Sequence, residues 1–70
     1  MVTYTTCSIR RSSISPYPME AFWQNRKIYT SQDPQHMVTE KILNHFGKQG
    51  WELHQTVLAT NGELLLIFKK

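Results

Sequence analysis

The chain has 70 residues and a formal net charge of +3; 40% of its residues are apolar and 19% are charged. This composition is ordinary for one small globular domain and excludes a disordered chain. Its single cysteine, Cys7, excludes an internal disulfide, and no cluster of Cys and His predicts a structural zinc site.

Size and hydropathy suggest where the protein works and what stabilises it. A domain of this length buries only roughly 60% of the surface that its unfolded chain exposes, so we expect association with copies of itself or with another protein to add stability. No apolar run approaches the roughly 20 residues needed to cross a bilayer, and no secretory signal is recognisable. We therefore expect a cytoplasmic protein that needs neither a metal nor a cofactor and does not bind a membrane.

The first part of the chain favours extended structure. Residues 2–11, VTYTTCSIRR, are β-branched and aromatic and predict a strand. Residues 12–25 begin with serines and prolines, which predict a loop or an extended segment. A second strand at 26–31 follows a turn around Gln24 and Asn25, and its pairing with the first strand would make a hairpin with a long loop.

A helix is predicted over residues 34–48. Asp33 occupies the N-cap position and Pro34 the first turn, where its missing N–H costs nothing. Gly50 is placed to end the helix in the left-handed conformation, and Gly47 to let the helix approach the sheet. Apolar residues recur every four positions and give the helix one buried face: Val38, Ile42 and Phe46.

The remaining residues predict a hairpin with strands at 51–60 and 63–70. Asn61–Gly62 indicates a two-residue type I′ turn, which pairs Leu58 with Leu65 and Thr56 with Ile67. This register places Leu58, Leu65 and Ile67 on the sheet face away from the helix, where exposed aliphatic side chains are an aggregation hazard. Either the first strand or residues 14–23 fold over this face, or a second copy covers it, or it is a ligand groove.

Together the elements predict an α+β fold, with one helix packed on an antiparallel sheet of three or four strands. One set of residues at the helix end and in the hairpin forms a recognisable pattern: Leu43, Asn44, Gly47, Gly50, Trp51, Glu52, Leu53, Phe68 and Lys69. Over roughly residues 38–70 this pattern resembles the domain of unknown function 4177, a family of small bacterial and phage proteins. The resemblance implies a small α+β domain that is often multimeric, and it implies no chemistry; residues 10–32 depart from the short linker typical of the family.

Catalytic residues are not recognisable. Cys7 with His36, His45 or His54 is the only thiol–imidazole combination, and Cys7 lies on a predicted strand with no helix N-terminus to lower its pKa. We expect Cys7 and Trp51 to be core residues. The acidic residues are dispersed and no phosphate-binding glycine motif is present, so we expect a protein that is not an enzyme.

Three functions are consistent with the sequence. The favoured one is an interaction module that binds itself through Leu58, Leu65 and Ile67 and acts as a regulator or inhibitor of another protein. Partner-binding candidates lie in the proline-flanked segment: Tyr17, Phe22, Trp23 and Arg26. The alternatives are an oligomer that binds a small anionic ligand or nucleotide, through Arg10, Arg11, Arg26 and Lys27, and, least favoured, a weak binder of single-stranded nucleic acid.

Overall fold

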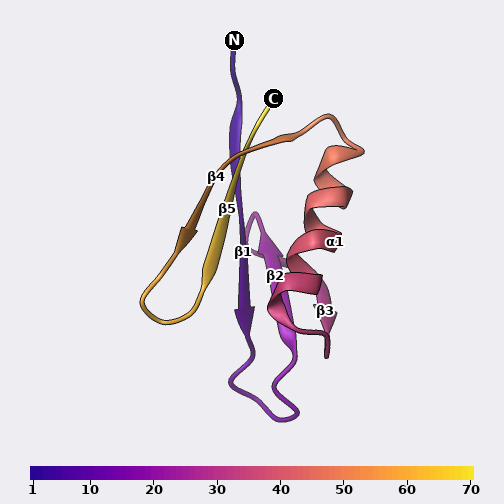
Figure 1. Cartoon of the computed structure of the whole chain (residues 1–70), viewed down its shortest axis with the longest axis vertical. Coiled ribbons are helices and arrows are strands. Elements are labelled where there is room, and N and C mark those ends of the chain that lie inside the picture. The colour runs from indigo at the N-terminus through magenta and orange to yellow at the C-terminus, as the bar shows by residue number, and fades with distance from the viewer.

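In the computed structural model, which describes all of residues 1–70, one helix packs against a single antiparallel sheet (Figure 1). The sheet has five strands in the order β3-β2-β1-β5-β4, so β1 is central and β3 and β4 are the edges. The elements in chain order are β1 (Tyr4–Arg11), β2 (Met19–Trp23), β3 (Arg26–Ser31), α1 (Gln35–Gly47), β4 (Glu52–Leu58) and β5 (Leu64–Lys69).

The predicted α+β class is confirmed, but the predicted number of strands is wrong. The segment 12–25 contains β2, which pairs with β1 on one side and β3 on the other, so β1 and β3 do not pair directly. A tight turn joins β2 to β3, with Gln24 and Asn25 both left-handed at φ 54° and 62°. Two successive positive φ values are the signature of a type I′ hairpin turn.

The core lies between the helix and one face of the sheet. Phe46 of α1 stacks on Phe68 of β5 with ring centroids 4.5 Å apart, and Trp23 meets the Phe46 ring edge-on at 5.3 Å. Fully burying an aliphatic or aromatic side chain of this kind stabilises the fold by about 1.5–3 kcal/mol. The buried residues are Cys7, Ile9, Met19, Ala21, Val38, Ile42, Phe46, Leu66 and Phe68.

The N-terminal end of the helix differs from the prediction. The helix begins at Gln35 after Pro34, whose extended ψ of 158° marks the boundary, and no side chain caps it. Asp33 instead forms a local loop with Ser31: its carboxylate accepts from the Ser31 hydroxyl at 2.7 Å, and its N–H donates to the same oxygen at 3.0 Å. The N-cap role predicted for Asp33 is therefore wrong.

The C-terminal end confirms the role predicted for Gly50 and corrects the role of Gly47. Gly50 has a φ of 88°, its N–H donates to Gly47 O at 3.1 Å, and the Trp51 N–H donates to Phe46 O at 3.0 Å. These two bonds form a Schellman motif, which satisfies the last carbonyls of the helix. A Cβ added at Gly47 would meet nothing within 4 Å, so Gly47 makes no close approach to the sheet.

The β4–β5 hairpin has a different register from the predicted one. Gly62 N–H donates to Ala59 O at 3.0 Å, Ala59 N–H donates to Glu63 O at 2.8 Å, and of the Asn61–Gly62 pair only Gly62 has a positive φ, 86°. This is a three-residue loop with a left-handed glycine, so Leu58 pairs with Leu64 and not with Leu65. Side chains alternate between the two sheet faces along a strand. This shift of one residue therefore moves each β4 side chain near the turn to the face opposite the predicted one.

The second sheet face carries no helix and is called the open face below. The interpretation that the first strand or residues 14–23 fold over it is wrong. β1 is the central strand and β2 lies within the sheet, so both contribute residues to the two faces. Ile14 lies in the loop between them with 75% of its surface exposed.

Candidate functional site

The open face has an apolar patch on β4 and β5, formed by Val57, Leu65 and Ile67. Val57 pairs directly with Leu65, and Ile67 follows on the same face of β5. Leu65 and Ile67 are half-buried, while Val57 is 38% exposed. Leu58, predicted for this surface, instead lies on the helix side of β4, where no helix reaches it and 69% of it is exposed.

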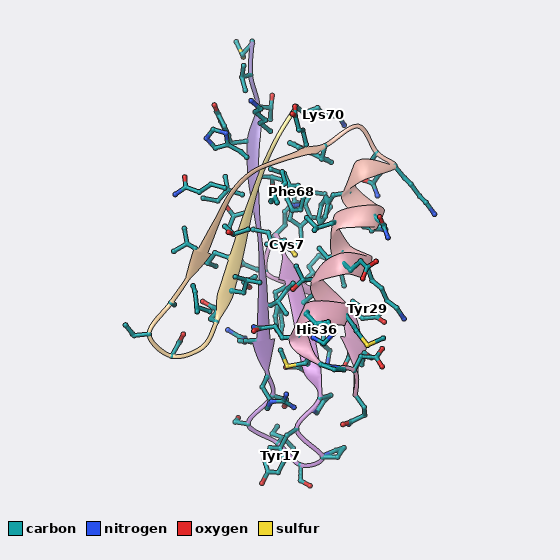
Figure 2. All side chains as sticks on the ribbon, viewed as in Figure 1. Cys7, Tyr17, Tyr29, His36, Phe68 and Lys70 are labelled. Atoms are coloured by element: carbon teal, nitrogen blue, oxygen red, sulfur yellow. The ribbon has the colours of Figure 1, made fainter.

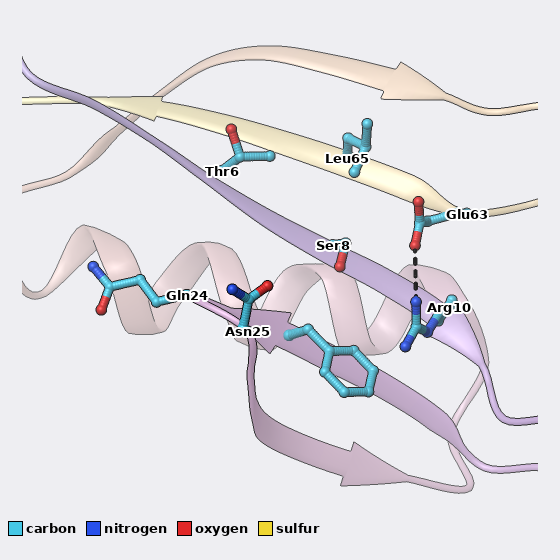
Figure 3. Close-up of a pocket in the computed structure, with 8 residues that line it drawn as sticks. Thr6, Ser8, Arg10, Gln24, Asn25, Glu63 and Leu65 are labelled. Carbon is cyan, nitrogen blue, oxygen red and sulfur yellow. Dashed lines mark hydrogen bonds and ion pairs between the residues drawn. The ribbon is translucent and has the colours of Figure 1, made fainter.

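Beside the patch lies a shallow depression of about 430 Å³ (Figure 3). Phe22 of β2 lines it, and Ser8 of β1 lies between Phe22 and Leu65 in one row across the sheet. The Arg10 guanidinium lies 4.3 Å from the Phe22 ring centroid and 3.5 Å from the Glu63 carboxylate. Its lining is largely polar: Thr6, Ser8, Arg10, Phe22, Gln24, Asn25, Glu63 and Leu65.

Charged side chains on the open face balance one another. Lys27 Nζ lies 3.1 Å from Glu20 Oε2, as Arg10 lies beside Glu63. By strand alternation Lys69 and Glu52 form a third, directly opposed pair on this face. The open face therefore has no net charge when these residues are ionised.

The predicted partner-binding residues do not form one surface. Tyr17 lies exposed in the β1–β2 loop, at the lower end of the molecule in Figure 2, whereas Arg26 begins β3 at the other end of β2. Trp23 faces the helix, where its indole N–H donates to Thr5 Oγ1 at 2.7 Å. Phe22 alone of the four contributes to the open face.

The four predicted anion-binding residues are also separated. Arg10 and Lys27 each have a glutamate partner, and Arg11 donates to the Tyr17 carbonyl oxygen at 2.8 Å. Arg26 is exposed at the β2–β3 turn. Only Arg10 and Arg11 come together, in a second depression of about 430 Å³, and the Glu63 carboxylate lines the same depression.

Cys7 has the properties of a core residue. It is fully buried, and burial raises the pKa of its thiol to about 11. A thiol in this state is a poor nucleophile because the thiolate is the reactive form. The three histidines are exposed, and His54 packs its ring against Tyr4 at a centroid distance of 5.3 Å.

No group of three or more His, Cys, Asp or Glu side chains is arranged to hold a metal ion. The helix α1 is neither long nor apolar enough to cross a membrane.

The sequence prediction missed Val57 as a surface residue because it rested on a two-residue turn. The signal that would have found it is Gly62 followed by Glu63, since a left-handed glycine closing a three-residue loop is the other common hairpin ending. Thr6 and Ser8 were not predicted as site residues, and Arg10 was predicted only as an anion-binding residue, because neither face of β1 is clearly apolar in the sequence.

Comparison with known proteins yields no relative: no family model, no curated protein and no solved structure matches this chain.

Proposed function

We propose that this protein is a non-enzymatic interaction module that associates with copies of itself through the open face and acts on a partner protein as a regulator or inhibitor. The observation that carries the proposal is the one-sided sheet. One helix covers one face, and the opposite face presents Val57, Leu65 and Ile67 side by side. Contiguous aliphatic side chains on an uncovered face are typical of a protein–protein contact.

The surroundings of the patch also favour a protein partner. Phe22 and the Arg10–Glu63 pair border it and offer an aromatic ring and hydrogen-bonding groups at its rim. An apolar centre with a polar rim is the usual anatomy of an interface. The neutral open face gives less support to an anionic ligand or a nucleic acid, because both require uncompensated positive charge.

Sedimentation and light scattering of the wild type and of Leu65→Asp test the open-face contact. We expect the wild type to be larger than a monomer at micromolar concentration. Leu65→Asp should lower the molar mass, because the contact would then bury an unpaired carboxylate. The matched control is Gln32→Asp, which adds the same charge at an exposed position between β3 and α1, beyond the opposite edge of the sheet, and should leave the mass unchanged.

A strictly monomeric wild type would refute self-association. An equal loss of mass in Leu65→Asp and Gln32→Asp would show that the effect is one of charge and not of the patch. Circular dichroism of both variants separates loss of contact from loss of fold, since neither position belongs to the buried core.

Two further expectations belong to this proposal. The single buried thiol suits a reducing compartment, which supports a cytoplasmic location. The likeness of residues 38–70 to the domain of unknown function 4177 supports a multimeric α+β domain, and on this likeness we propose membership of that family.

A further inference from the structure

The outer edge of β4 is a long strand edge with little protection. No strand lies beyond β4 in the sheet, and all of its 7 residues are exposed (Figure 1). β4 contains no proline, lysine or arginine, and its one charged residue, Glu52, lies at its start. Proline and charged side chains are the devices that usually prevent a free edge from pairing with another chain.

The opposite edge, β3, differs in these respects. It begins with Arg26 and Lys27, and the register shift between Ala21 and Phe22 disturbs its pairing with β2. Lys41 of the adjacent helix also lies near it, 5.8 Å from the Tyr29 ring centroid. Pairing between two copies is therefore favoured at β4 and disfavoured at β3.

Hydrogen-bond alternation determines which groups of β4 are free. The Ala59 N–H donates to Glu63 O, and Thr3 and Lys70 exchange two backbone hydrogen bonds at the ends of β1 and β5. In an antiparallel ladder such bonded positions alternate, so Val57 is directed at Leu65. The N–H and C=O groups of Thr56 and Leu58 consequently point out from the edge of the sheet.

We infer that a second copy of this chain adds to this edge, with its β4 antiparallel to the first and a two-fold axis at Val57. This register opposes Thr56 of each copy to Leu58 of the other, so that the two free residues bond to one another. Val57 then opposes Val57 of the second copy, and Gln55 opposes Ala59. No charged residue is placed opposite a like charge. The register shift between Leu53 and Gln55 ends the pairing toward the start of β4.

A second copy fits this edge because the edge is complementary to itself. β4 is apolar on both faces near the axis, with Leu58 69% exposed on the helix side and Val57 38% exposed on the open face. Strands that are apolar on both faces usually lie inside a sheet. Pairing would cover both residues and would join the apolar patches of the two copies into one. The inference shares with the proposed function the premise that the chain self-associates. The contact at the β4 edge is separate from the contact proposed for the open face.

Disulfide trapping tests the register. Residues that face each other between hydrogen-bonded pairs have Cα atoms about 4.5 Å apart, which suits a disulfide. Val57→Cys should therefore give a covalent dimer under mild oxidation, whereas the native Cys7 is buried and should not react. The matched control is Gln55→Cys, on the same strand and the same face. In this register Gln55 opposes Ala59 of the second copy, so the two introduced cysteines would lie about four residues apart along the paired strands.

Equal cross-linking of the two cysteine variants would overturn the register, since it would indicate random collision. Trapping only at Leu65→Cys would overturn the edge contact in favour of an open-face contact.

A proline variant tests the edge without a disulfide. Thr56→Pro removes an N–H that points away from β5, so the β4–β5 ladder should persist, as edge strands tolerate proline in this orientation. We expect Thr56→Pro to abolish trapping of Val57→Cys, and Leu65→Asp to leave that trapping intact. If Leu65→Asp lowers the mass and Val57→Cys is not trapped, the edge contact fails and the proposed function stands. If Val57→Cys is trapped specifically and Leu65→Asp does not change the mass, the edge contact stands and the open-face contact of the proposed function fails.

Discussion

Gly47 and Gly50 lie three residues apart at the end of the helix, yet they have different structural roles. Gly50 has a φ of 88°, a conformation that costs an L-amino acid roughly 1–2 kcal/mol, and it allows the Schellman bonds that end the helix. Gly47 is the last helical residue and faces open space. Only Gly50 is required by the backbone, and Gly47 is a weak point in the helix.

Replacing each glycine by alanine should change stability in opposite directions. Gly50→Ala should lower the free energy of unfolding by about 1–2 kcal/mol through left-handed strain. A steric clash should add little, because the new Cβ would meet only the flexible Lys70 side chain, at 3.4 Å. Gly47→Ala should raise it by about 0.5–1 kcal/mol through lower backbone entropy in the unfolded chain. Urea denaturation measures both as shifts of the midpoint at constant slope. A loss of stability in Gly47→Ala would mean that this site makes a close approach to another part of the molecule.

At the scale of the elements, turn chemistry decides which side chains reach the surface. The β2–β3 turn is the two-residue type, and it contains no glycine, with Gln24 and Asn25 both left-handed. The β4–β5 turn contains Asn61–Gly62 but is the three-residue type, in which Asn61 Oδ1 accepts the Glu63 N–H at 3.0 Å. This difference of one residue moves Leu58 to the helix side of the sheet and Val57 to the open face.

Substitutions in the two turns test this assignment. Asn61→Gly should lower the free energy of unfolding by about 1 kcal/mol, because it removes the hydrogen bond to Glu63 and adds entropy to the unfolded chain. Gln24→Asn should raise it by a few tenths to about 1 kcal/mol, since asparagine adopts the left-handed conformation more readily than glutamine. Thermal or urea unfolding of the two variants provides the measurement. If Asn61→Gly were neutral, a type I′ turn with positive φ at Asn61 would be the better description.

These elements also show how much of the fold the sequence determines. The helix could be predicted from the four-residue recurrence of Val38, Ile42 and Phe46 and from Gly50, which are local signals. β2 was not predicted because the prolines before it favour a loop. Met19, Ala21 and Trp23 nevertheless alternate as in a strand with one face toward the core. The order of the strands depends on contacts between distant residues, which no local pattern encodes. The open-face site was found in part, through Leu65 and Ile67, and its error at Leu58 follows from the turn.

At the scale of the whole molecule, the net charge lies outside the open face. The charged residues that belong to the open face balance, while Arg11, Arg26, Lys41, Lys48 and Lys70 outnumber Asp33 and Glu40 elsewhere. Lys70 lies over the Trp51 ring at 4.9 Å, close to the helix end, where cations interact favourably with the helix dipole. The overall positive charge is thus compatible with a neutral open face.

This distribution predicts that the proposed self-association depends little on salt. The dissociation constant of the wild-type assembly, measured by analytical ultracentrifugation, should change by less than about threefold between roughly 50 and 200 mM salt, because an apolar contact between neutral faces releases few counterions. Binding of a fluorescent single-stranded oligonucleotide, measured by anisotropy in parallel, should be weak and should fall steeply over the same range. The salt dependence of these two measurements distinguishes the two functions. Salt-independent assembly supports the protein interaction module. Tight oligonucleotide binding that is weakened by Arg10→Gln and by Lys27→Gln would instead assign the open face to nucleic acid.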